Sequence, residues 1–194
     1  MTILGRLAAV FKATGGMTYT RRFQMTGYTN MKNLPKLITA ILKTYERPEF
    51  QPKIKDGKVV ETYCNFAARE IAGIMGYHKF AGKTANQLHD FLRSSSDWKE
   101  IDMEDAQFLA NQGTLVFASL PASQMSGTHG HICVVRPGEE IYSARFRRKV
   151  PAVMNIGGQN FILRFKMKTG QVIDAGVNGA FTMIPKFFAW KDSL

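Results

Sequence analysis

The sequence is short of cysteine, of acidic residues and of long apolar runs. Two cysteines in 194 residues cannot form a disulfide framework, so the fold does not depend on bridges and the redox compartment stays undetermined. No run approaches the roughly 20 apolar residues that cross a bilayer, which argues against an integral membrane protein. Arg6 and Lys12 interrupt the apolar N-terminal stretch, so we predict no signal peptide and synthesis in the cytoplasm.

Acidic residues are outnumbered by basic ones, 15 to 26, which gives a net charge of +11. This excess must lie on the surface, where it favours an anionic partner such as nucleic acid, anionic lipid or an acidic cell-wall polymer. The densest basic cluster, around Phe146, lies between two predicted strands and forms either a solvated hairpin tip or an anion-binding loop. Its members are Arg145, Arg147, Arg148 and Lys149. Arginine with aromatics also binds single-stranded nucleic acid, but no known nucleic-acid module accompanies the cluster, so we do not predict that partner.

Apolar periodicity changes along the chain from a helical to a strand pattern. Helices are predicted over 33–45, 64–75, 84–92 and 104–110, and strands over 114–120, 131–136, 149–155, 160–166 and 171–174. Residues 53–58 read as a basic loop that turns at Asp56-Gly57, and the aromatic tail 181–190 is expected to pack on the core. Helices followed by antiparallel strands are typical of the α+β class, and the length suits one globular unit.

Cys64 opens the second predicted helix, and His131 opens an apolar strand 67 positions later. A cysteine at a helix N-terminus lies at the positive end of the helix dipole, which favours the thiolate. A histidine at a strand end can be held against that sulfur as its base. The free backbone N–H of Cys64 is a donor for an oxyanion. Together these features point to a cysteine hydrolase.

A third group should fix the histidine tautomer by accepting a hydrogen bond from its second ring nitrogen. Asn155 is the first choice, since it ends the next strand and can lie beside His131 in an antiparallel hairpin. Gln159 and Asn160 are the second and third choices. His129 lies in the same loop as His131 and is an alternative base, but a strand is the more rigid mount.

Zinc binding is a different use of the same residue types. His129, His131, Cys133 and Cys64 are all ligand types, but their spacing matches no common zinc motif. We therefore predict no metal and no cofactor. Cys133 shares a strand face with His131 and is interpreted as buried packing behind the site.

The order of a cysteine helix, a Gly-His-apolar strand and a polar residue on the next strand resembles the papain-like cell-wall amidases of the NlpC-type and CHAP groups. Cys64-Asn65-Phe66-Ala67 is similar to their nucleophile segment, and residues 130–135 are similar to their histidine strand. The resemblance covers about residues 60–165. At the nucleophile, Tyr63-Cys64-Asn65 replaces the group's commoner Asp-Cys-Ser or Gln-Cys-Thr.

This resemblance implies a papain-like core, with the nucleophile helix packed on an antiparallel sheet. The catalytic domain would span residues 61–194, and residues 1–60 would be an N-terminal extension packed on or covering it. The implied reaction is hydrolysis of an amide in peptidoglycan peptide through a thioester acyl-enzyme. Tyr63 and Asn65 would contribute to the oxyanion site or line the cleft. Action at the cell wall or periplasm would follow lysis, secretion or carriage on a virion.

A second class of function stays open. A phage or secretion-associated structural or binding protein could keep a papain-like fold without catalysis and use its basic face to bind an anionic partner. Thiol reactivity separates the two classes, because an active site predicts fast alkylation of Cys64 and a structural protein predicts two slow thiols.

Overall fold

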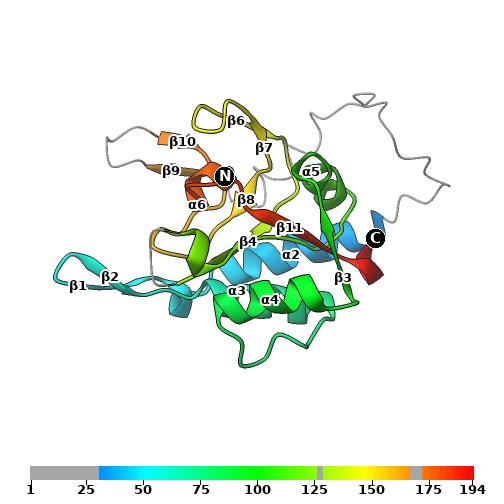
Figure 1. The fold of residues 1–194 in the computed structure, drawn as a ribbon, viewed down its shortest axis with the longest axis horizontal. Coiled ribbons are helices and arrows are strands. Elements are labelled where there is room, and N and C mark those ends of the chain that lie inside the picture. The colour runs from blue at the N-terminus through cyan, green and yellow to red at the C-terminus, as the bar shows by residue number, and fades with distance from the viewer. Residues whose placement is uncertain (1–30, 126–128, 167–171) are drawn as a thin grey trace.

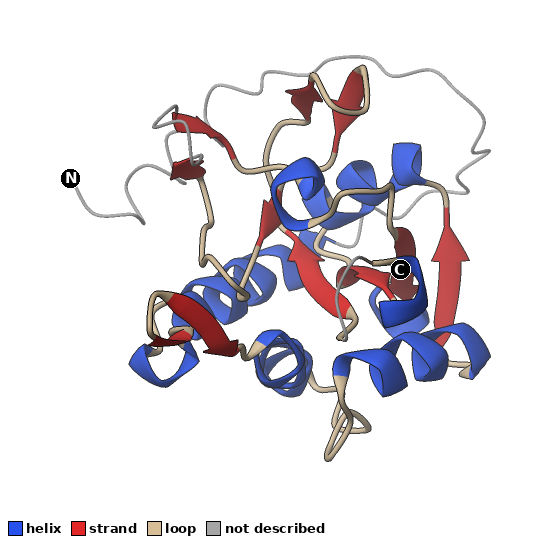
Figure 2. Cartoon of the chain, turned by 60° about the vertical axis from the view of Figure 1, so that its left-hand side comes forward, coloured by secondary structure: helices blue, strands red, loops and turns tan. Residues whose placement is uncertain are grey.

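The computed structural model describes residues 31–125, 129–166 and 172–194 (Figure 1). Residues 1–30, the first half of the predicted extension, lie outside the described residues. The described chain is of the α+β class with antiparallel sheets, as predicted (Figure 2). No helix in these ranges is both long enough and apolar enough to cross a membrane.

The α-helices are α2 (Leu34–Tyr45), α3 (Cys64–Met75), α4 (Ala85–Ser94), α5 (Met103–Asn111) and α6 (Val177–Ala180), and the 3-10 turns are η1 (Met31–Asn33), η2 (Pro48–Phe50), η3 (Ala122–Gln124) and η4 (Lys191–Ser193). The strands are β1 (Lys53–Lys55), β2 (Lys58–Glu61), β3 (Trp98–Ile101), β4 (Val116–Leu120), β5 (His131–Val135), β6 (Ile141–Ser143), β7 (Arg148–Val150), β8 (Val153–Met154), β9 (Arg164–Lys166), β10 (Val172–Asp174) and β11 (Lys186–Trp190).

A five-stranded antiparallel sheet, in the order β3-β11-β4-β5-β8, forms the centre of the fold. Because side chains alternate along a strand, its two faces build two apolar layers. Phe117, Ile132 and Val134 face the layer shared with α2, α3 and α4. Cys133 and Val135 face the layer shared with α5. Figure 1 shows α5 on the other side of the sheet from α3 and α4. The sheet therefore holds β5, which begins at His131, between helices on both sides.

The aromatic tail does pack on the core, but it does so as a central strand. Strand β11 lies between β3 and β4, and Phe187 and Phe188 are both buried. The predicted strand 149–155 is wrong in one respect, since β7 and β8 belong to different sheets. Pro151 separates them, because proline has no N–H to continue a ladder.

The predicted basic loop over 53–58 is also different in the structure, where it forms the hairpin β1–β2. Its turn is the predicted one, and Asp56 and Gly57 both have positive φ, at 51° and 70°. Such a pair is typical of the tight turn that matches the twist of two antiparallel strands. All the strand residues are exposed, so the alternation that reveals a half-buried strand is missing.

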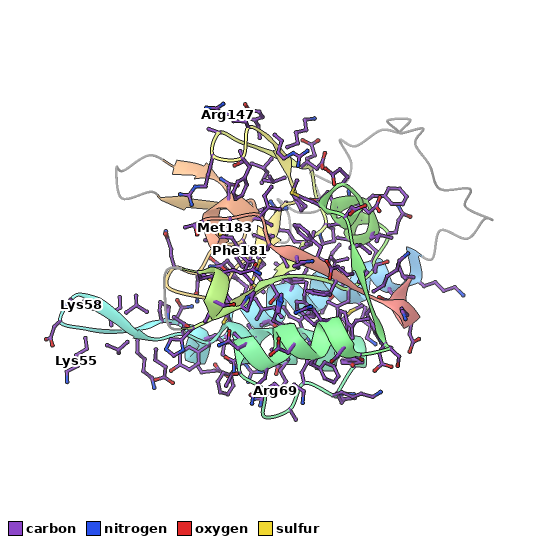
Figure 3. The ribbon with its side chains drawn as sticks, in the orientation of Figure 1. Lys55, Lys58, Arg69, Arg147, Phe181 and Met183 are labelled. Carbon is purple, nitrogen blue, oxygen red and sulfur yellow. The ribbon has the colours of Figure 1, made fainter. Side chains whose placement is uncertain are left out.

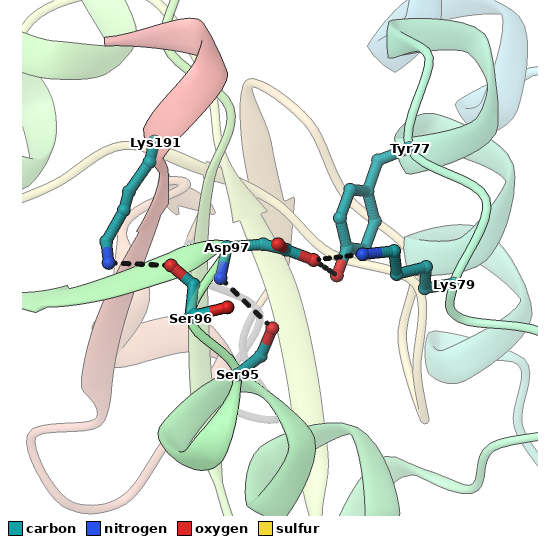
Figure 4. Close-up of polar contacts among 6 residues, drawn as sticks. All are labelled: Tyr77, Lys79, Ser95, Ser96, Asp97 and Lys191. Atoms are coloured by element: carbon teal, nitrogen blue, oxygen red, sulfur yellow. Dashed lines mark hydrogen bonds and ion pairs between the residues drawn. The ribbon is translucent and has the colours of Figure 1, made fainter.

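A polar cluster closes the edge of the fold where β11 ends (Figure 4). The Asp97 carboxylate accepts hydrogen bonds from Tyr77 Oη at 2.9 Å and Lys79 Nζ at 2.8 Å. These two bonds, the Lys79 bond the stronger, hold the pKa of Asp97 below its usual value. Lys191 Nζ donates to the Ser96 carbonyl at 2.6 Å, which fixes the end of β11 beside the loop before β3.

Helix α2 packs in the same core as α3. Leu37, Ala40 and Ile41 are buried in the apolar layer that also holds Ala68 and Ile71. At its N-terminus the helix approaches the turn between α5 and β4 closely. A Cβ on Gly113 would lie 2.5 Å from the backbone nitrogen of Leu34, so only glycine allows this contact.

Gly113→Ala tests that docking, and Gly82→Ala is the matched control. Both glycines have positive φ, at 89° and 71°, but the space around Gly82 is open. In both variants alanine must adopt the left-handed backbone conformation, which costs about 1–2 kcal/mol of stability. We expect Gly113→Ala to lose about 1–3 kcal/mol more in free energy of unfolding, measured by urea denaturation. Equal losses would contradict the close contact between α2 and the α5–β4 turn.

Candidate active site

Cys64 is the first residue of α3, and its side chain is only 6% exposed. The first hydrogen bond of the helix runs from Ala67 N to Tyr63 O at 2.9 Å, so the amides of residues 64–66 have no carbonyl one turn before them. The backbone N–H groups of Ile132 and Asn65 bond to the Cys64 sulfur. The start of α3 and strand β5 thus each provide a backbone donor to the sulfur.

His131 lies between Cys64 and Asn155, with hydrogen bonds to both side chains. Its Nε2 is 2.6 Å from Asn155 Oδ1, and Asn155 Nδ2 donates to the Gln159 carbonyl at 2.7 Å. Because a carbonyl only accepts, this second bond fixes which end of the Asn155 amide faces the ring. Nε2 therefore carries a proton, which leaves Nδ1 to exchange a proton with Cys64.

Antiparallel pairing of β5 and β8 brings His131 and Asn155 together. Val134 pairs with Met154 and Val135 with Val153, so Asn155 follows β8 as the chain returns along β5 toward His131. Beyond it the chain folds over the imidazole. A Cβ on Gly157 would lie 3.0 Å from His131 Cε1, so a larger residue would push the ring. On another side, the Phe181 ring centroid lies 5.2 Å from that of His131.

The electrostatics of the pair favour separated charges. Burial works against the Cys64 thiolate, but the hydrogen bond and charge of His131 and the two backbone donors outweigh it and lower the pKa of the thiol. Burial likewise opposes the imidazolium, but the bonds to Cys64 and Asn155 raise the pKa of His131. The two pKa values shift in opposite senses, and each shift stabilises the charged form of its group, so the surroundings favour a thiolate beside an imidazolium.

Cys133 is in the opposite electrostatic situation. Its side chain is 4% exposed and lies in the layer behind the sheet. Burial, with the negative charge of Cys64 as a smaller cause, raises the pKa of Cys133 well above its usual value. This thiol therefore stays protonated, which agrees with a packing role.

Two buried side chains behind His131 form a polar chain that sequence reasoning missed. Ser119 Oγ donates to the His131 carbonyl at 3.2 Å and lies 3.2 Å from His89 Nδ1. Since the Ser119 proton goes to the carbonyl, His89 Nδ1 must donate to Ser119. Burial lowers the pKa of His89, which favours the neutral ring. These hydrogen bonds from His89 to Ser119 and from Ser119 to the carbonyl anchor the backbone of His131 to α4. No local sequence pattern predicts them.

The alternative residues have other positions. Asn160 Oδ1 accepts from Gly157 N at 2.9 Å and its Nδ2 donates to Phe50 O at 2.9 Å, so it shapes the loop over His131. Gln159 contributes its backbone carbonyl to Asn155, while its side chain is exposed. His129 is exposed, and the ring that bonds to Cys64 is that of His131. Of the three candidate orienting residues, the structure therefore places Asn155 at the ring.

Tyr63 and Asn65 flank the sulfur but make contacts away from it. Asn65 Nδ2 donates to the Lys83 carbonyl at 3.0 Å, which ties the start of α3 to the loop before α4. The Tyr63 ring packs against Phe50 and Phe66, with centroid distances of 6.3 and 5.9 Å. These contacts place the Tyr63 ring in an aromatic group with Phe50 and Phe66.

The basic cluster lies on the β6–β7 hairpin, where all four of its residues are exposed. Figure 3 shows Arg147 at the outer end of this hairpin. Arg145 donates to the Phe181 carbonyl at 3.5 Å, and Arg148 forms an ion pair with Glu104 at 3.4 Å. Arg147 has a positive φ of 52° at the turn. The predicted hairpin tip is therefore present, and Arg145 links it to the residue that contacts His131.

The residues considered for zinc do not assemble into a metal site. Within residues 31–125, 129–166 and 172–194, no three His, Cys, Asp or Glu side chains are grouped so as to hold a metal ion. The hydrogen bond to the Asn155 amide oxygen engages one of the two ring nitrogens of His131. The arrangement suits proton transfer between sulfur and imidazole, followed by attack of the thiolate on a carbonyl carbon.

Iodoacetamide alkylation measures the state of the two thiols. We expect Cys64 in the native protein to react with an apparent pKa below the free-thiol value of about 8.5, while Cys133 stays unmodified. The rate should fall as pH drops through the lowered pKa, since protonation removes the thiolate. In His131→Ala the pKa of Cys64 should rise, because burial then acts without its main opposing partner. Peptide mass spectrometry reads each site, and a pKa unchanged by His131→Ala would contradict the coupled pair.

Ser119→Ala tests the polar chain behind His131. Removing the hydroxyl leaves two buried polar partners unpaired, so we expect about 1–3 kcal/mol less free energy of unfolding and slower alkylation of Cys64. Ser143→Ala is the control, because Ser143 is equally buried and its Oγ accepts from Phe146 N. It should lose similar stability but keep the alkylation rate. Equal alkylation in both variants would show that the chain does not position His131.

Comparison with known proteins does not identify this site. No protein-family model matches the chain, and no curated protein is similar enough to it to count as a match. The geometry of Cys64, His131 and Asn155 is therefore the basis for assigning a function.

Proposed function

We propose that this protein is a cysteine-dependent amidase or endopeptidase that hydrolyses amide bonds in bacterial cell-wall peptide. The observation that carries the proposal is the row Cys64–His131–Asn155, in which two opposed pKa shifts favour a thiolate beside an imidazolium. A buried ion pair of this kind is costly unless its members are well bonded, and all three side chains here have partners. A nucleophile with a base and an orienting group is the usual composition of a thiol hydrolase.

In this proposal the Cys64 thiolate attacks the amide carbonyl carbon. The negative charge passes to the carbonyl oxygen, where the free N–H of Cys64 at the start of α3 acts as a donor. His131 gives its Nδ1 proton to the leaving nitrogen, the C–N bond breaks, and a thioester remains on Cys64. Water then attacks the thioester while Nδ1 takes its proton, which releases a carboxylic acid and restores the ion pair. No metal or organic cofactor takes part.

Asn155 acts through the histidine. By accepting from Nε2 it keeps the ring in the orientation that points Nδ1 at the sulfur, and it stabilises the charged form of the ring. Gly157 and Phe181 enclose the same ring, which limits its rotation.

The cell-wall substrate follows from the resemblance of this chain to the NlpC-type and CHAP groups. A helix that begins with cysteine and packs on an antiparallel sheet with histidine at a strand start supports a papain-like core for residues 61–194. The net charge of +11 would raise the encounter rate with an anionic wall polymer, an effect that salt weakens. Burying the Cys64–His131 ion pair costs desolvation energy, and a non-catalytic binding protein has no evident use for such a pair.

Hydrolysis of purified peptidoglycan, followed by the release of new amines, tests the proposal. Cys64→Ala should abolish activity, and His131→Ala should reduce kcat about 10²- to 10⁴-fold. Cys133→Ala is the matched control and should keep activity. Full activity of Cys64→Ala, or none in the parent protein with any wall type, would reject the proposal in favour of a binding or structural role.

The pH profile of kcat/KM should be bell-shaped. Activity requires the thiolate and so rises through the lowered pKa of Cys64, and it requires the imidazolium and so falls through the raised pKa of His131. Asn155→Ala removes a bond that raises the His131 pKa, so its basic limb should move to lower pH. A basic limb that stays in place would exclude this role for Asn155.

A further inference from the structure

The hairpin β1–β2 projects from the body of the protein next to the start of α3 (Figures 1 and 3). Every residue of the two strands is exposed, including three apolar side chains: Ile54 at 65%, Val60 at 61% and Val59 at 44%. A two-stranded ribbon that buries neither face gains little stability from packing. Clustered exposed apolar side chains of this kind are typical of a binding surface.

The base of the hairpin is fixed to the nucleophile segment. Lys53 Nζ and Glu61 Oε2 form an ion pair at 2.6 Å, and both side chains also hydrogen-bond to that of Tyr63. Lys53 Nζ lies 5.7 Å from the centroid of the Tyr63 ring. Because Tyr63 directly precedes Cys64, the direction of the hairpin is set relative to the sulfur.

The tip of the hairpin carries two lysines that face each other, with Asp56 in the turn between them. Lys55 and Lys58 are cross-strand partners, and like charges at such positions destabilise a ribbon. Among the described residues, no carboxylate lies within ion-pair distance of either lysine. Ile54 and Val59 are the next pair along the ladder. Because side chains alternate along a strand, Ile54 and Val59 face the opposite side of the ribbon from the two lysines. An extended peptide paired with a strand edge also points successive side chains to alternate faces, so its acidic side chain would relieve the repulsion on one face while its apolar neighbour covers the other.

We propose that the β1–β2 hairpin binds an acidic, extended segment of the substrate peptide and directs it toward Cys64. Lys55 and Lys58 bind a carboxylate on one face of the ribbon, and Ile54 and Val59 contact the neighbouring apolar side chains of the peptide on the other face. The free strand edges offer backbone hydrogen bonds to an extended chain. This assignment rests on the proposed function, since it specifies which class of peptide the same site would take as substrate. A membrane surface fits less well, because the most distal residues, Lys55 to Lys58, include no large apolar side chain.

Peptide binding to the full-length Cys64→Ala protein tests this assignment without turnover. The probe is a synthetic cell-wall stem peptide with free carboxylates, compared with the same peptide in which the carboxylates are amidated. We expect Lys55→Gln/Lys58→Gln to weaken binding of the acidic peptide about fivefold and to leave the amidated peptide unaffected. Ile54→Thr/Val59→Thr should weaken both peptides. Lys32→Gln/Lys43→Gln removes the same charge from exposed sites on η1 and α2 and should change neither.

Three results would overturn the proposal. They are equal binding by the lysine variant and its parent, an equal loss in the Lys32→Gln/Lys43→Gln control, and no binding of the acidic peptide at millimolar concentration. Sedimentation with phosphatidylglycerol vesicles that depends on Ile54 and Val59, with no peptide effect, would assign the hairpin to a membrane instead. Peptidoglycan hydrolysis by the parent protein is measured separately, so a failure of catalysis is distinguished from a failure of the hairpin to bind peptide.

Discussion

The hydrogen bond from His131 Nε2 to Asn155 Oδ1 is the constraint on which the rest of the site depends. It determines that Nδ1 is the ring nitrogen that faces Cys64. Nδ1 can therefore exchange a proton with the sulfur. The bond from Asn155 to the Gln159 carbonyl orients the amide, and Gly157 leaves room for the ring. Each of these partners comes from the loop that follows β8, so a single loop fixes the protonation pattern of the pair.

The sheet provides the stiffness that this bond needs. His131 starts β5, a strand whose other residues are buried and which is paired on both sides, with β4 and with β8. Its own carbonyl is held by Ser119 and, through Ser119, by His89 on α4. Cys64 comes from the opposite layer on α3. The pair therefore forms at the boundary between a helix layer and a sheet edge, where both backbones are held by packing rather than by each other.

The sequence supported the α+β class, the helix beginning at Cys64 and the strand beginning at His131, because each has a strong periodicity and a clear start signal. The choice of Asn155 over Gln159 and Asn160 depended on the register between the His131 strand and the next strand. The order of these strands along the chain suggested that register but did not determine it. The hairpin β1–β2 escaped prediction because it has no buried face. The His89–Ser119 chain was not predictable, since it joins elements 30 residues apart through tertiary contact alone.

The position of β11 has a consequence for the order of assembly during synthesis. Of the five strands in the central sheet it is the last to be made, yet it lies between β3 and β4. Until it is inserted, β3 has no neighbour in that sheet and β4 presents an open edge beside the strand that carries His131. Cys64 and His131 are thus translated before the sheet that carries His131 can close, and that sheet is complete only once this strand has left the ribosome.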